Sequence, residues 1–249
     1  MKIKPDYPSI NILGLKVNSV NMAETLSFVS KTVSDDEFAQ ILTLNAEIAY
    51  LSFNDKERRK LVNNCDLVTP DGSGIMWAAE QYGSPVSERV AGIDLLQNLL
   101  GVGAKEQYRF YFLGAKEDIV AEAAKKVKTQ YNCNVVGFHN GYFSDDESLQ
   151  IVDDIKNSGA NILFVAMGYP RQDMWIAKYA KSAGVNVGVG VGGSFDVLAG
   201  KVKRAPAFWQ NIQMEWFYRL LKDPRRLKRT MNLPKFMSAV KKDINKKEK

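Results

Sequence analysis

An aspartate between proline and glycine is the clearest candidate for a reacting group in this chain. Asp71 lies in the stretch Thr69-Pro70-Asp71-Gly72, directly after the apolar pair Leu67-Val68. A carboxylate held on such a loop can take a proton from a substrate hydroxyl, which is the task of a general base. Aspartate also forms turns and caps helices, and the residues alone do not decide between these roles.

Other polar clusters also follow apolar runs. Thr43 and Asn45 close the run 38–44, Gly168 and Gln172 follow the run 161–167, and a glycine-rich stretch ending at Asp196 closes the run 185–191. Open parallel sheets place their functional loops at the carboxyl ends of the strands. These clusters are therefore expected to lie at one edge of a sheet.

The helices and strands that must position these residues are predicted to form an α/β fold. Helices and strands alternate along the chain, which predicts a Rossmann-like, mostly parallel sheet with helices on both faces. A small β element is expected at residues 10–20, and Asn21 is expected to cap a helix to about residue 33. The expected strands are 38–44, 67–68, 109–113, 134–138, 161–167 and 185–191, and the expected helices include 46–65, 117–131, 144–158 and 172–183.

A glycine pattern follows the last strand. Gly188, Gly190 and Gly193 match the dinucleotide fingerprint in form, but this match alone is weak. Such a site needs an acidic ribose ligand about 20 residues further on, and residue 213 is Gln. Close approach of the backbone to some other ligand is the favoured interpretation. Arg89 precedes a helix, where it would suit a phosphate or remain a surface charge.

Charge divides the chain near residue 200. Residues 201–249 contain 15 Lys and Arg against 4 Asp and Glu, whereas the rest of the chain has 19 against 24. Aromatic residues such as Trp209 and Trp216 are interleaved with these basic residues. The division predicts a catalytic core at 1–200 and a basic, aromatic, helical appendage at 201–249 that seeks an anionic membrane or nucleic acid.

The appendage is expected to contain two helices. Apolar positions 208, 209, 212, 216, 217 and 220 fit one face of a helix that begins near Pro206 and ends at Asp223-Pro224. A second short helix is expected from residue 225 towards 231. Residues 241–249 are expected to fray.

Composition narrows the remaining classes. Two cysteines and one histidine cannot fill a tetrahedral zinc site, and buried free thiols in a reducing compartment are expected for Cys65 and Cys133. No apolar run is long enough to span a bilayer, and no secretory h-region follows the N-terminus. The chain is expected in the cytoplasm. No Asp-x-Asp pair supports a metal site.

Six of these stretches, taken in order, resemble the motifs of the WecG/TagA/CpsF glycosyltransferases. They are Thr43-Leu44-Asn45-Ala46-Glu47, Thr69-Pro70-Asp71-Gly72, Glu88-Arg89-Val90-Ala91-Gly92, Phe112-Leu113-Gly114-Ala115, Gly168-Tyr169-Pro170-Arg171-Gln172-Asp173 and Gly190-Val191-Gly192-Gly193-Ser194-Phe195-Asp196. The resemblance covers about residues 10–230. None of the six is specific alone, but six in register make chance agreement improbable.

The resemblance implies an inverting, metal-independent transferase that needs no cofactor and works at the inner face of the cell membrane as a peripheral protein. Typical members move N-acetylmannosamine from UDP-N-acetylmannosamine to undecaprenyl-diphospho-N-acetylglucosamine in teichoic acid synthesis. Others use another UDP-hexose for capsule or exopolysaccharide. A basic-tailed nucleic-acid binder is the more distant alternative, and a homo-oligomer remains open.

The resemblance also implies roles for individual residues. Asp71 corresponds to the general base, with Thr43 and Asn45 beside it. The implied substrate-binding residues are Arg89, Gln172, Gly190, Gly192, Gly193, Asp196, Arg219, Arg225, Arg226 and Arg229.

Overall fold

A six-stranded parallel sheet forms the centre of the molecule. The computed structural model describes residues 7–206, 208–209, 214–222 and 227–247. Its strand order is β4-β3-β8-β7-β5-β6, and every pair of neighbours is parallel. The strands are β3 (Ala39–Leu44), β4 (Leu67–Pro70), β5 (Arg109–Gly114), β6 (Asn134–His139), β7 (Ile162–Ala166) and β8 (Val187–Gly190).

The small N-terminal β element is confirmed. Strands β1 (Ser9–Ile12) and β2 (Leu15–Asn18) pair antiparallel across a turn in which Gly14 has a φ of 82°. The turn needs glycine because this φ is strained for a residue with a Cβ. The predicted cap is also confirmed, since Asn21 and Glu24 form a capping box at the start of α1 (Met22–Ser34).

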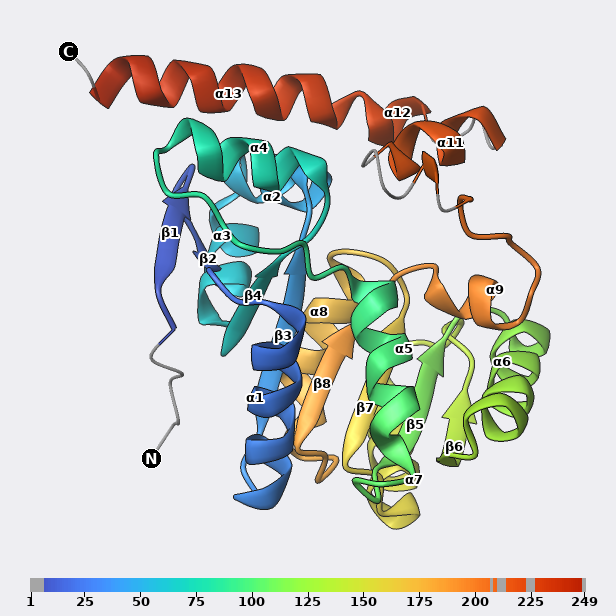
Figure 1. The fold of residues 1–249 in the computed structure, drawn as a ribbon. Coiled ribbons are helices and arrows are strands. Elements are labelled where there is room, and N and C mark those ends of the chain that lie inside the picture. Colours follow the sequence, from blue (N-terminus) through green and yellow to red (C-terminus); the bar gives the residue numbers. More distant parts are fainter. Residues whose placement is uncertain (1–6, 207, 210–213, 223–226, 248–249) are drawn as a thin grey trace.

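Helices cover both faces of the sheet (Figure 1). On one face, α1, α5 (Gly92–Gly103), α6 (Glu117–Tyr131) and α9 (Ser194–Leu198) pack on strand residues such as Phe110 and Phe112. On the other, α7 (Ser148–Ser158), α8 (Arg171–Trp175) and the π-helical turn η1 (Ile176–Ala180) pack on Tyr111 and Leu113. Alternate residues of a strand point to opposite faces, so one strand serves both layers.

The predicted helix 46–65 is two helices. The chain forms α2 (Ala46–Phe53) and α3 (Lys56–Asn64), which are separated at Asn54 and Asp55. Asp55 has an extended backbone, and its side chain accepts hydrogen bonds from the N–H groups of Glu57 and Arg58. This cap starts a new helix where the apolar periodicity alone suggested one.

The C-terminal segment differs from its prediction in two places. Of the helix expected from residue 206, residues 208–209 and α11 (Glu215–Lys222) are helical in the described part of the chain, but Met214 between them is not. Helix α12 (Leu227–Thr230) follows, and residues 210–213 and 223–226 lie outside the described part. The expectation that residues 241–249 fray is wrong as far as Lys247, because α13 (Asn232–Lys247) is one continuous helix.

Helix α13 is held by its apolar face. Phe236 and Val240 are fully buried, and they join a third apolar cluster with α2, α3, β1 and β2. The helix lies across α2 and α4 (Ser73–Gln81) at the top of Figure 1. Residues four apart share one helix face, so this pair docks α13 on the core. The end of the C-terminal segment therefore packs on the core through α13.

Candidate active site

A cavity of about 510 Å³ opens beside the carboxyl ends of β3, β4, β7 and β8. The structure thus brings together polar strand ends that are far apart in sequence. Ten of the residues implied by the resemblance line it: Thr43, Asn45, Asp71, Arg89, Gln172, Gly190, Gly192, Gly193, Asp196 and Arg229. The parallel sheet explains this gathering, because all its strands end at the same edge.

Asp71 lies between the end of β4 and the N-terminus of α4. Its backbone N–H donates to the carbonyl of Leu44 in the neighbouring strand β3, which holds the loop against that strand's end. The N-cap of α4 is Gly72, with a φ of 83°, and no side chain caps this helix. Asp71 is thus not the N-cap residue of α4, and it lines the cavity.

Thr43 and Asn45 come from the end of β3. Asn45 caps α2, since its side-chain oxygen accepts from the N–H of Ile48 at 3.0 Å. Its amide nitrogen has no hydrogen-bond partner among the described residues, and Asn45 lines the cavity. The hydroxyl of Thr43 lies so near Gly92 that a Cβ there would approach it to 3.0 Å. Gly92 thus lets α5 start directly against the end of β3.

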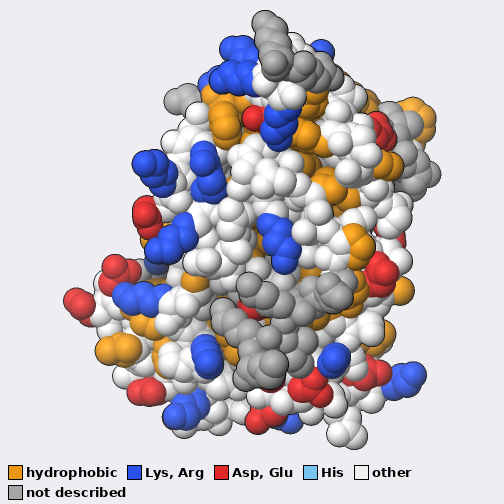
Figure 2. Space-filling model, turned by 90° about the vertical axis from the view of Figure 1, so that its left-hand side faces the viewer, with side chains coloured by type: hydrophobic (Ala, Val, Ile, Leu, Met, Phe, Trp, Pro, Cys, Tyr) orange, Lys and Arg blue, Asp and Glu red, His pale blue; other side chains and the backbone are white. Residues whose placement is uncertain are grey.

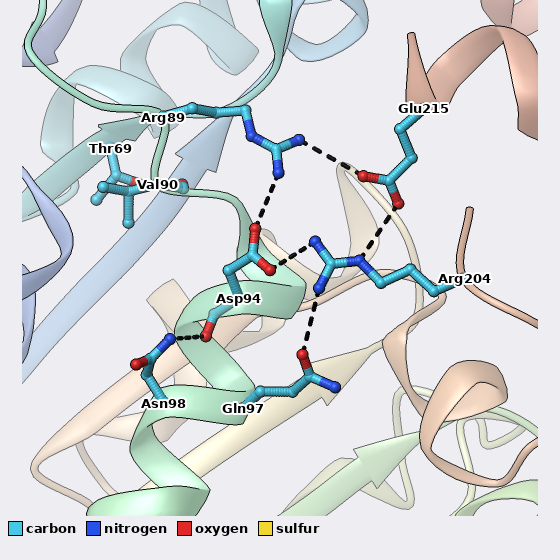
Figure 3. Close-up of polar contacts among 8 residues, drawn as sticks. All are labelled: Thr69, Arg89, Val90, Asp94, Gln97, Asn98, Arg204 and Glu215. Carbon is cyan, nitrogen blue, oxygen red and sulfur yellow. Dashed lines mark hydrogen bonds and ion pairs between the residues drawn. The ribbon is translucent and has the colours of Figure 1, made fainter. Parts of the chain in front are cut away.

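Arg89 is placed by two bonds between its loop and β4. The Val90 N–H donates to the Pro70 carbonyl at 2.8 Å, and the Thr69 hydroxyl donates to the Val90 carbonyl at 3.0 Å. These bonds hold the loop before α5 against the edge strand β4 (Figure 3), and Arg89 on this loop lines the cavity. The guanidinium pairs with Asp94 at 3.0 Å and with Glu215 at 3.5 Å.

Gln172 joins two of the loops around the cavity. Its side-chain oxygen accepts from the N–H groups of Gly168 and Gly192, each at 3.1 Å. The side chain is buried, and it packs so closely on Gly190 that a Cβ there would clash with it. Gln172 thus fixes the ends of β7 and β8 relative to each other.

The glycine pattern has a packing explanation in two of its three positions. A Cβ on Gly188 would clash with Ile176, and one on Gly190 with Gln172 and Asp173. Gly192 instead faces open space and has a φ of 52°, and a Cβ on Gly193 would only make ordinary contact with the Asp196 carboxylate at 3.8 Å. The Gly192 N–H is already held by Gln172. The pattern therefore arises largely from close contact between β8 and the helices beneath it.

The C-terminal segment reaches the cavity through Arg229. Its Nε lies 2.9 and 3.1 Å from the two carboxylate oxygens of Glu47 in the first turn of α2. Trp216 of α11 and Leu233 of α13 also line the cavity. Arg225 and Arg226 lie outside the described residues, as does the side chain of Arg219.

Asp173 is a buried carboxyl group behind the cavity. It is 1% exposed, and neither of its carboxylate oxygens has a hydrogen-bond partner in the described part of the chain. Burial raises the pKa of this carboxyl to about 7. Burial, together with the nearby Asp173, also raises the pKa of the Cys65 thiol well above its usual value. The pKa of Tyr169 rises to about 12, again chiefly through burial.

Sequence reasoning missed several residues of the site. Glu47 belongs to the motif Thr43-Leu44-Asn45-Ala46-Glu47, so its position at the cavity near Asn45 could have been predicted. Asp94, Arg204 and Glu215 were not predicted as site residues, since their partners are up to 126 residues away. Trp216 was assigned to the basic, aromatic appendage and not to the cavity. His139 does not line the cavity in the described structure; its Nδ1 lies 2.8 Å from the Asn140 carbonyl oxygen.

The remaining compositional expectations concern cysteines, metals and membranes. Cys65 and Cys133 are free and buried, as predicted. Within the described ranges, no three His, Cys, Asp or Glu side chains form a group suited to a metal ion. No described helix is both long enough and apolar enough to cross a bilayer.

Comparison with known proteins adds the following matches. Residues 10–249 match the model of the glycosyl transferase WecG/TagA/CpsF family. An N-acetylglucosaminyldiphosphoundecaprenol N-acetyl-beta-D-mannosaminyltransferase of Bacillus spizizenii is 36% identical over 223 residues, which cover 88% of this chain and 86% of the relative. A protein of the same name from Bacillus subtilis is 33% identical over 234 residues, covering 93% and 90%.

Proposed function

Because the chain belongs to the glycosyl transferase WecG/TagA/CpsF family, we propose that it transfers N-acetylmannosamine from UDP to N-acetylglucosamine on undecaprenyl diphosphate. The observation that carries this proposal is the name shared by two relatives that match most of the chain. The product would be the disaccharide that begins wall teichoic acid. These matches do not favour the nucleic-acid alternative.

The cavity offers the groups that an inverting transfer needs. In this mechanism Asp71 takes the proton of an acceptor hydroxyl, and the hydroxyl oxygen forms a bond to the anomeric carbon of the donor sugar. The bond from that carbon to the diphosphate breaks, and UDP leaves with the electron pair. The attack from the opposite side inverts the configuration. A general base contributes roughly 10²–10⁴ in rate.

The leaving diphosphate gathers negative charge, so cations beside it lower the barrier. Arg89 and Arg229 line the same cavity as Asp71 and fit this role. The Gly192 N–H is engaged by Gln172, so we assign less of this stabilisation to the glycine loop than to the arginines. The remaining arginines implied by the resemblance, Arg219, Arg225 and Arg226, are proposed to assist.

An assay of UDP release tests the proposed function. The protein is incubated with UDP-N-acetylmannosamine, UDP-N-acetylglucosamine or UDP-glucose, with and without a short-chain lipid diphosphate carrying N-acetylglucosamine. We expect release from the first donor, only when the acceptor is present, and undiminished by a metal chelator. If UDP were released only from UDP-N-acetylglucosamine or only from UDP-glucose, the donor would be a different sugar. If no UDP were released from any of the three donors, the proposal would be contradicted.

The lipid acceptor implies that the protein meets a membrane, and we propose that the C-terminal segment binds its surface. Five of the nine large exposed apolar side chains in the described structure lie between Val202 and Met231. At the other end of the segment, Figure 2 shows Lys and Arg side chains beside apolar ones around the C-terminal end of α13, at the top of the view. Each basic residue near an anionic leaflet contributes about 1 kcal/mol, and apolar side chains add to this by insertion.

We expect the double variant Leu221→Glu/Leu227→Glu to bind vesicles of phosphatidylglycerol and phosphatidylcholine about tenfold or more weakly than the wild type in co-sedimentation. Both side chains are more than half exposed, so the fold should persist. Leu149→Glu is the matched control, because Leu149 is 66% exposed on α7 and should not affect binding. Equal binding by all three proteins would exclude this surface.

A further inference from the structure

Four charged side chains form a closed ring at the rim of the cavity (Figure 3). Arg89 pairs with Asp94 at 3.0 Å and with Glu215 at 3.5 Å, while Arg204 pairs with the same two carboxylates at 2.6 and 3.7 Å. Arg204 also donates to the Gln97 side chain at 3.3 Å. The ring thus joins four segments: the loop before α5, the first turn of α5, the chain after α9 and the first turn of α11.

The ring is partly removed from water. The side chains of Arg89, Asp94 and Arg204 are 19–23% exposed, and that of Glu215 is 8% exposed. Charges in such a position interact more strongly than on an open surface. Two cations and two anions balance within the ring, so displacing the carboxylate that lines the cavity, Glu215, leaves a net positive charge beside it that another anion can neutralise.

The carboxylates of Asp94 and Glu215 differ in their position relative to the cavity and in their distances to the two arginines. Arg89 and Glu215 line the cavity, whereas Asp94 is not among its described lining residues. The Asp94 pairs lie within hydrogen-bond distance, but both ring distances of Glu215 are longer. In keeping with this, the buried Nε of Arg204 has no hydrogen-bond partner within the described structure. Within the ring, Glu215 is therefore the more readily displaced anion.

We propose that these carboxylates act in opposite directions on donor binding: Asp94 positions Arg89, and Glu215 occupies the place beside Arg89 that the donor's diphosphate takes. This inference rests on the proposed function, since it needs a nucleoside diphosphate as ligand. Displacement of Glu215 releases the first turn of α11. Because the next residue, Trp216, also lines the cavity, donor arrival rearranges this wall of the site.

Binding of UDP, measured by calorimetry without acceptor, separates the two roles. Glu215→Gln removes the competing charge with little change in shape, and we expect it to lower the Kd of UDP about fivefold. Glu215→Asp keeps the charge but shortens the side chain by one methylene, so it should also tighten binding. Asp94→Asn should raise the Kd about tenfold, because Arg89 loses its closest partner. Glu122→Gln, which breaks a surface pair with Lys126 on α6, is the control and should leave the Kd unchanged.

Backbone hydrogen exchange in 215–222 gives a second readout that a merely structural ring would not produce. We expect UDP to speed exchange at the start of α11 in the wild type, and Glu215→Gln to exchange fast without UDP. Slower exchange on adding UDP, or weaker UDP binding by both Glu215 variants, would overturn the inference while leaving the proposed function in place. A wild-type protein that does not bind UDP would overturn both.

Discussion

Replacing Asp71 with Asn is expected to lower turnover by about 10²–10⁴ while the protein remains folded. The amide has nearly the shape of the carboxylate, but it cannot take the proton from the acceptor hydroxyl. The N-cap position of helix α4 is taken by Gly72 and not by Asp71, so we expect the helix to persist in the variant. The measurement is the initial rate of UDP release with saturating donor and lipid acceptor.

Two comparisons make this result specific. The Kd of UDP should stay close to that of the wild type, because the base acts on the acceptor side. Asp153→Asn, which changes an exposed carboxylate on α7, should retain full turnover. A folded Asp71→Asn protein that turns over at the wild-type rate would exclude Asp71 as the base.

Replacing Asp173 with Asn is expected to remove much of the pH dependence of stability near neutral pH. Burial raises the pKa of this carboxyl from its usual 3.8 to about 7 in the folded protein. Between these values the folded state keeps a proton that the unfolded chain has lost, so stability falls as pH rises from about 4 to 7. Above pH 7 the loss levels off. A shift of this size corresponds to on the order of 4 kcal/mol.

Asparagine stays neutral at every pH, so it avoids the cost of burying a charge. At pH 8 we expect the variant to unfold about 10 °C above the wild type, with little difference at pH 4. Thermal unfolding followed by circular dichroism across this range measures the effect, with Asp153→Asn as an exposed control. Parallel curves for Asp173→Asn and the wild type would show that the buried carboxyl does not titrate in this way.

The parallel sheet and many of the residues that line the cavity could be predicted from the sequence, and particular residues show why. Asn21 and Glu24 form a capping box, which marks the start of a helix in the sequence itself. The apolar run that ends at Leu44 is typical of a strand buried on both faces of a parallel sheet. Errors arose where tertiary contacts outweighed local composition. The lysine-rich end of the chain suggested fraying, but Phe236 and Val240 dock α13 on the core.

By itself, the sequence determined that Thr43, Asp71, Gln172 and Asp196 would meet. Each lies at or after the carboxyl end of an apolar strand, and parallel strands all end at one edge of the sheet. Tertiary structure alone decided what faces them there. The strand order places β3 between β4 and β8. The side-chain oxygen of Gln172 accepts a hydrogen bond from the Gly192 N–H, and Glu215 forms an ion pair with Arg89. These partners lie far apart in the chain, and local patterns carry no record of which distant side chains meet.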